Sequence, residues 1–132
     1  MNIFFDVDYT IVDSEGMLLR PYVKEVFAQL VADGHHIYLW SGMGVRWEVV
    51  HAHGLAAFVR DCFAKPVQNH EQERVRLGIP FRPDYVVDDT PGVVSAFGGF
   101  VIPLFSPWNT PEDTEMLRAY EAIQQFAAGR SG

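Results

Sequence analysis

Short apolar runs alternate with amphipathic stretches from one end of the chain to the other. Buried strands are expected at residues 2–7, 36–40, 57–63, 85–87 and 99–102, and helices at residues 21–33, 45–53, 69–77 and 111 to about 127. Strands that are separated by helices form parallel βαβ units, whose sheet is covered by helices on both faces. The pattern therefore predicts an α/β fold with a mainly parallel sheet.

The first and last helices have recognisable boundary signals. Over residues 21–33, apolar side chains recur three and four positions apart, which gives this helix one apolar face. Pro21 suits its first turn, and Gly34 suits its end. Thr110 is the expected N-cap of the last helix, directly ahead of Pro111.

Length and composition predict a single domain over residues 1–132, because a chain of 132 residues is too short to form two good cores. No apolar run approaches the roughly 18 residues that suggest a membrane span, so no membrane partner is expected. The net charge is −7, and the sequence has no basic stripe to contact the phosphates of a polynucleotide. We therefore expect no nucleic-acid partner.

The sequence favours a cytoplasmic location. The first ten residues contain Asp6 and Asp8 and no basic residue, unlike a secretory signal. Cys62 is the single cysteine of the chain, so it has no partner for an internal disulfide, which fits a reducing compartment.

Acidic residues follow two of the expected strands directly. Asp6, Asp8 and Thr10 form an Asp-x-Asp-x-Thr motif after the first strand, and Asp88 and Asp89 follow the fourth. Carboxylates this close repel each other unless a cation or a shared proton intervenes. Taken alone, such residues are also typical of an acidic turn or a strand-end cap. Because parallel sheets bind ligands at the carboxyl ends of their strands, these positions are candidates for a functional site.

Two further polar residues stand at the ends of the second and third strands. The hydroxyl of Ser41 and the free backbone N–H groups around Gly42 are suited to hold an anion, although a turn or N-cap serine is the plainer alternative. Lys65 follows the third strand. A lysine there is usually a solvated surface charge, but the chain has only two lysines, Lys24 and Lys65.

In chain order these residues are Asp-x-Asp-x-Thr, serine, lysine and Asp-Asp, and they resemble the four motifs of the haloacid dehalogenase superfamily. The match spans residues 6–89. The resemblance implies a three-layer Rossmann-like fold whose five-stranded sheet has the order 5-4-1-2-3, with Asp6 on the central strand. It also implies a phosphatase, because members that displace halide lack the second aspartate of the first motif, which is Asp8 here.

The resemblance implies catalytic and metal-binding roles for three aspartates. Asp6 would be the nucleophile that forms an aspartyl-phosphate. Asp8 would protonate the leaving oxygen and later take a proton from water. Mg²⁺ would be held by the Asp6 carboxylate, the Asp8 backbone carbonyl and Asp88.

The remaining motif residues would hold the phosphate or support the site. Ser41, Gly42 and Lys65 would bind the phosphoryl oxygens, and Lys65 would also neutralise charge around the nucleophile. Thr10 would fix the loop. Asp89 would support the metal through water.

The spacing of the motifs predicts that no cap domain covers the site. Only 12 residues separate Asp8 from Pro21, and 23 separate Ser41 from Lys65, most of which belong to an expected helix and strand. By resemblance, capless members act on large substrates or close their sites by oligomerising. The expected partners are therefore a phosphorylated small molecule or a phosphoprotein, with a homo-oligomer as a further expectation.

Two other functions use similar residues. A response-regulator receiver is a Mg²⁺-dependent aspartyl-phosphate switch on a similar sheet. Its acidic pair comes first and its lysine last, whereas Lys65 here precedes Asp88 and Asp89. A non-catalytic relative that serves as a binding or scaffold module is the second alternative, and a turnover assay separates it from an enzyme.

Overall fold

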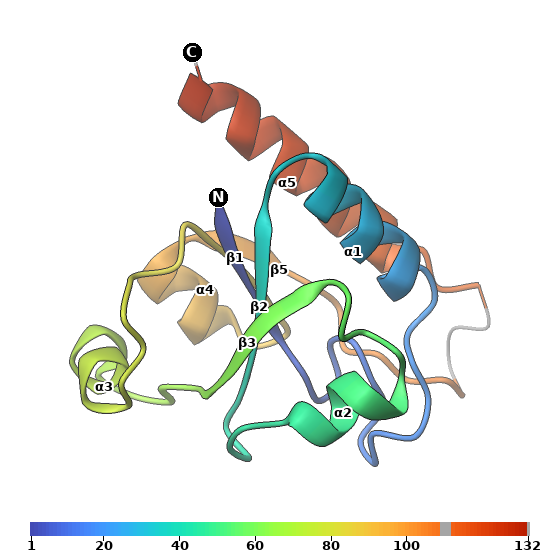
Figure 1. Cartoon of the computed structure of the whole chain (residues 1–132), viewed down its shortest axis with the longest axis horizontal. Coiled ribbons are helices and arrows are strands. Elements are labelled where there is room, and N and C mark those ends of the chain that lie inside the picture. Colours follow the sequence, from blue (N-terminus) through green and yellow to red (C-terminus); the bar gives the residue numbers. More distant parts are fainter. Residues whose placement is uncertain (109–111, 132) are drawn as a thin grey trace.

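The computed structural model describes residues 1–108 and 112–131 (Figure 1). It contains a sheet of five parallel strands, which are β1 (Asn2–Asp6), β2 (His36–Ser41), β3 (Val59–Ala64), β4 (Tyr85–Asp88) and β5 (Gly99–Val101). Their order is β3-β2-β1-β4-β5. Read from the other edge, this is the expected succession 5-4-1-2-3, and β1 lies at the centre.

Helices cover both faces of the sheet and complete three layers (Figure 1). On one face, α1 (Val23–Ala32) and α5 (Glu115–Ser131) pack side by side, whereas α3 (His70–Arg76) and α4 (Pro91–Phe97) lie on the other. The short helix α2 (Trp47–Ala52) connects β2 to β3. Within the described part of the chain, no helix combines the length and the apolar character that crossing a bilayer requires.

Alternation of side chains along the strands builds a core on each side of the sheet. On β1, Ile3 and Phe5 belong to the larger apolar cluster under α1 and α5, and Phe4 belongs to the cluster under α4. The ring of Phe4 stacks on that of Tyr38, with centroids 5.0 Å apart. Burial on both faces explains why the central strands read as continuous apolar runs in the sequence.

Helix α4 is the one element of the described chain that the sequence analysis did not predict. Its opening Pro91-Gly92 pair is typical of a turn. Val93, Val94 and Phe97 nevertheless lie on one buried face of a seven-residue helix. Packing against the sheet therefore decides the conformation of a segment too short to show a clear helical period.

The ends of the predicted elements shift by one or two residues, except in the last helix. This helix begins at Glu115, whereas the expected start was residue 111. The carboxylate of Asp113 accepts a hydrogen bond of 2.9 Å from the backbone N–H of Glu115 and so caps the helix. Thr110, the predicted N-cap, and Pro111 lie outside the described residues.

Candidate functional site

The predicted motif residues meet at the carboxyl edge of the sheet. Asp6 ends β1, Ser41 ends β2 and Asp88 ends β4, while Lys65 follows β3 directly. These four strands are parallel neighbours, so their carboxyl ends lie along one edge. Residues that are widely separated in the sequence are thereby brought into one site.

Lys65 lies between two of these carboxylates. Its Nζ is 3.0 Å from Oδ1 of Asp6 and 3.2 Å from Oδ2 of Asp88, so a single ammonium group bridges both. The three side chains are at most 9% exposed. The backbone also places the lysine, because its N–H donates to the carbonyl oxygen of Ser41 at 2.9 Å. A buried carboxylate without such a partner would be costly.

Burial alters the ionisation of this cluster. Burial, reinforced by the charge of Asp88, raises the pKa of Asp6 to about 8, although Lys65 acts in the opposite direction. Burial also raises the pKa of Asp88, again against the influence of Lys65. For Lys65, burial lowers the pKa, but the two carboxylates outweigh it and the net pKa is raised. The single positive charge of Lys65 therefore does not balance the negative charge of the site when its carboxylates are ionised.

Three carboxylates of the site are close enough to share a metal ion. Ligand oxygens of Asp6, Asp88 and Asp89 lie within 4.8 Å of one another. This set contains both metal-binding carboxylates expected from the sequence and adds Asp89, for which a water-mediated role was expected. The carboxylate of Asp8 is not part of the set, and its contribution through the backbone carbonyl stays a prediction.

Asp8 and Ser41 form a second part of the site together with Arg46. Ser41 donates from Oγ to Oδ2 of Asp8 at 3.2 Å and accepts a hydrogen bond from the backbone N–H of Met43 at 3.0 Å. Nη1 of Arg46 lies 2.6 Å from the same oxygen of Asp8. Ser41 thus shapes the turn after β2 and also contacts the candidate general acid.

The loop after β2 separates Ser41 from the next helix. Helix α2 begins at Trp47, so the N-cap alternative for Ser41 is wrong and the turn alternative is confirmed. Gly42 follows Ser41 and is exposed at the edge of the sheet. Phosphate binding by Ser41 and Gly42 stays a prediction.

Thr10 and Arg20 fix the loop that follows β1. Oγ1 of Thr10 donates to Oδ2 of Asp6 at 3.1 Å, and the supporting role of Thr10 stays a prediction. Nη1 of Arg20 in turn donates to the carbonyl oxygen of Thr10 at 3.1 Å. Arg20 also forms a 2.9 Å ion pair with Asp113 and donates to the carbonyl oxygen of Pro103 at 2.7 Å. Arg20 could not be recognised from the sequence, because no motif or periodicity links it to partners so distant along the chain.

Replacing Arg20 by alanine should lower the free energy of unfolding by about 3–5 kcal/mol, since Asp113 would remain buried without its partner. Both side chains are 1% exposed, so water does not replace the lost contacts. Urea denaturation measures the change. Arg60→Ala, at an exposed position on β3, is the control and should change stability by less than about 0.5 kcal/mol. Equal stabilities of the two variants would show that the Arg20 contacts give no net stabilisation.

The segments beside the site are as short as the spacing predicted. Residues 7–22, between β1 and α1, form turns and two isolated bridges, which pair Asp8 with Val12 and Val12 with Leu19. Between β2 and β3, the described chain forms the six-residue helix α2. The exposed parts of these segments therefore border the site.

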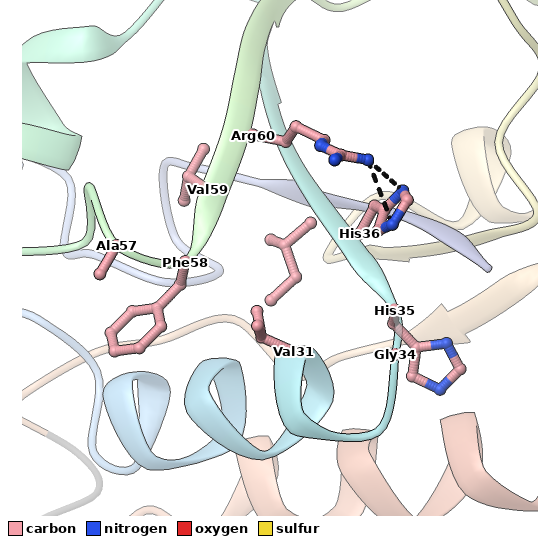
Figure 2. Close-up of a pocket in the computed structure, with 9 residues that line it drawn as sticks. Val31, Gly34, His35, His36, Ala57, Phe58, Val59 and Arg60 are labelled. Atoms are coloured by element: carbon pink, nitrogen blue, oxygen red, sulfur yellow. Dashed lines mark hydrogen bonds between the residues drawn. The ribbon is translucent and has the colours of Figure 1, made fainter.

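A separate hollow lies at the opposite edge of the sheet (Figure 2). Val31 at the end of α1, Phe58 and Arg60 line it, and Nη1 of Arg60 lies 2.5 Å from Nδ1 of His36. Figure 2 shows His35 and His36 pointing in different directions, as expected for neighbours at the start of a strand. None of the predicted site residues is among the described residues that line this hollow, so it is distinct from the candidate site.

The sequence of the whole chain can be compared with protein families and with curated proteins. No protein-family model matches it, and no curated protein is similar enough to count as a relative. A function for this chain therefore has to be argued from the residues and geometry of the site.

Proposed function

We propose that this protein is a Mg²⁺-dependent phosphatase of the haloacid dehalogenase type, which hydrolyses a phosphomonoester through an aspartyl-phosphate on Asp6. The observation that carries the proposal is the bridging of Asp6 and Asp88 by Lys65 at the carboxyl edge of the sheet. Titratable groups clustered in this way, with perturbed pKa values, are typical of functional sites. A purely structural ion pair would not account for a third carboxylate, Asp89, beside the first two.

The topology supports the same proposal. Open α/β sheets bind their ligands beyond the carboxyl ends of the strands. Because β1 is the central strand, Asp6 lies in the middle of that edge, between the neighbours that end in Ser41 and Asp88. A nucleophile at this position has phosphate-binding groups on one side and metal ligands on the other.

The site fits a divalent metal ion. Its donors are the hard carboxylate oxygens of Asp6, Asp88 and Asp89, which are ligands that Mg²⁺ prefers. The position of the Lys65 ammonium group marks a place where positive charge is favourable. When bound, Mg²⁺ would neutralise charge on the phosphoryl oxygens during the reaction. The backbone carbonyl of Asp8 is the further ligand that we propose.

In the proposed reaction, a carboxylate oxygen of Asp6 attacks phosphorus, the bond from phosphorus to the leaving oxygen breaks, and Asp8 donates a proton to that oxygen. Water then attacks the phosphorus of the aspartyl-phosphate and gives a proton to Asp8. Inorganic phosphate leaves and the Asp6 carboxylate is restored. Ser41, the N–H of Gly42 and Lys65 would bind the phosphoryl oxygens throughout.

Two neighbours orient Asp8 for its part in this reaction. Among the described residues, both Ser41 and Arg46 donate to Oδ2 of Asp8. We therefore assign proton transfer to the other oxygen, Oδ1. Arg46 acts in this scheme as a positioning residue, which holds the carboxylate of Asp8 in one orientation.

Hydrolysis of an aryl phosphate by the purified protein, with and without Mg²⁺, tests the proposal. We expect turnover in Mg²⁺, its loss on addition of a chelator and its recovery when Mg²⁺ is restored. The thermal-unfolding midpoint should also rise with Mg²⁺, because a ligand that binds only the folded state stabilises it. Turnover that is indifferent to chelation would contradict the metal-dependent mechanism. No turnover across a panel of phosphorylated metabolites and phosphopeptides would favour the scaffold alternative.

A further inference from the structure

Tyr9, directly after the second aspartate of the first motif, has a backbone conformation that favours glycine. Its φ is 64°. The N–H of Tyr9 donates to the carbonyl oxygen of Val12 at 2.9 Å, and its own carbonyl accepts from the N–H of Phe105 at 2.7 Å, which holds the residue in place. A non-glycine residue in this region costs free energy, and such residues cluster at functional sites. A tyrosine at a position that favours glycine therefore indicates that its side chain has a function.

The side chain of Tyr9 lines two hollows beside the candidate site. It is 40% exposed. The first hollow, of about 650 Å³, is also lined by Asp8, Met43 and Arg46. The second, of about 340 Å³, is also lined by Leu18, Leu104 and Phe105. Both volumes are in the range of small-molecule sites. The two hollows share Tyr9, Ser14 and Glu15 as lining residues, and we treat them as one cleft that borders the candidate general acid and has an apolar wall.

The charged residues that line this cleft are mainly acidic. They include Asp13, Glu15 and Glu48 in addition to Asp8. The cation among the described lining residues is Arg46, which is already paired with Asp8 at 2.6 Å and with Glu48 at 2.5 Å. A substrate group with its own carboxylate or phosphate would therefore meet negative charge here and find no free cation.

We propose that this cleft holds the leaving group of the substrate, and that it selects phosphomonoesters whose leaving group is apolar or aromatic and carries no negative charge. This assignment rests on the proposed phosphatase function and specifies its substrate class. The ring of Tyr9 provides a surface for stacking. Leu18 and Leu104, each 53% exposed, provide apolar surface that such a leaving group would cover.

Binding of phosphonates, whose carbon–phosphorus bond is not hydrolysed, tests this selectivity separately from catalysis. Calorimetric titration of the Mg²⁺-loaded protein compares phenylphosphonate, methylphosphonate and 4-carboxyphenylphosphonate. Phenylphosphonate should bind more tightly than methylphosphonate. It should also bind about fivefold more tightly than the carboxylated analogue, the factor expected for one like-charge contact near a solvated surface.

Variants of Tyr9 give the sharpest comparison. Tyr9→Gly should weaken binding of phenylphosphonate relative to methylphosphonate by roughly three- to tenfold, while the thermal-unfolding midpoint holds or rises because the backbone strain is relieved. Tyr9→Phe keeps the ring and should keep the preference. Leu104→Ala should reduce the preference, whereas Leu117→Ala, a leucine on α5 that is 41% exposed, should not.

Three results would overturn the proposed selectivity. These are equal weakening of both ligands in Tyr9→Gly, equal binding of phenylphosphonate and its carboxylated analogue, and no binding of any phosphonate. A different result would refute the proposed phosphatase activity and leave the proposed selectivity of the cleft intact. In that case the protein would turn over no phosphomonoester, yet would bind phenylphosphonate in a manner that depends on Tyr9.

Discussion

Asp6→Asn should lower turnover of an aryl phosphate by roughly 10⁴-fold or more, because an amide does not act as the nucleophile in this reaction. Asparagine is nearly the same size as aspartate, and Asp6 is only 4% exposed, so the packing around it is kept. Steady-state and single-turnover kinetics at saturating Mg²⁺ measure the loss. The rise of the unfolding midpoint with Mg²⁺ should also shrink, because one of the three clustered carboxylates is gone.

Asp61→Asn is the matched control for this variant. Asp61 lies on β3, and its carboxylate accepts a 2.8 Å hydrogen bond from the adjacent backbone N–H of Cys62, outside the cluster at the carboxyl edge. Turnover and the response to Mg²⁺ should both be retained. Near-normal activity of Asp6→Asn would exclude Asp6 as the nucleophile, whatever the control does.

Lys65→Ala should lower turnover by about 10²–10³-fold, which is typical for the loss of a preorganised donor to a transition state. The ammonium group contacts both Asp6 and Asp88, so its removal leaves the phosphoryl group and the carboxylates less compensated. Affinity for Mg²⁺ should hold or rise while catalysis falls, because a competing positive charge is removed. Kinetics over a Mg²⁺ titration separate the two effects.

Stability provides a second measurement on the same variant. Without metal, Lys65→Ala should lower the free energy of unfolding by about 3 kcal/mol, since two buried carboxylates lose their partner. Addition of Mg²⁺ should recover part of this loss. Lys24→Ala, at an exposed position on α1, is the control and should change neither turnover nor stability appreciably. If the two lysine variants behave alike, the contacts of Lys65 with Asp6 and Asp88 contribute neither to turnover nor to stability.

The positions of the strands and of most motif residues could be predicted from the sequence for one physical reason. A central parallel strand is buried on both faces, so it appears as a short apolar run, and the first polar residue after it marks the carboxyl edge. Asp6 and Asp88 follow this rule directly. Lys65 lies at the same edge although β3 is an edge strand that contains Arg60 and Asp61 and begins at Val59, not at the expected residue 57.

Contacts that depend on distant partners could not be predicted in this way. The ion pair of Arg46 with Asp8 depends on the conformation of the loop after β2, and the spacing of residues in the sequence does not predict that conformation. The start of α5 depends on the Asp113 cap, whose other oxygen pairs with Arg20. Local sequence signals describe elements well, but they do not describe which side chains meet after the elements pack.

The ion pair of Arg20 and Asp113 joins residues that lie 93 positions apart. During synthesis, every motif residue from Asp6 to Asp89 leaves the ribosome before Asp113 does. A nascent chain therefore carries the complete set of motifs for a time without the ion pair that holds Arg20, the donor to the carbonyl oxygen of Thr10. Pairings of such long range form late in folding. We therefore expect the loop that contains Asp8 to become fully ordered only after the C-terminal helix has docked.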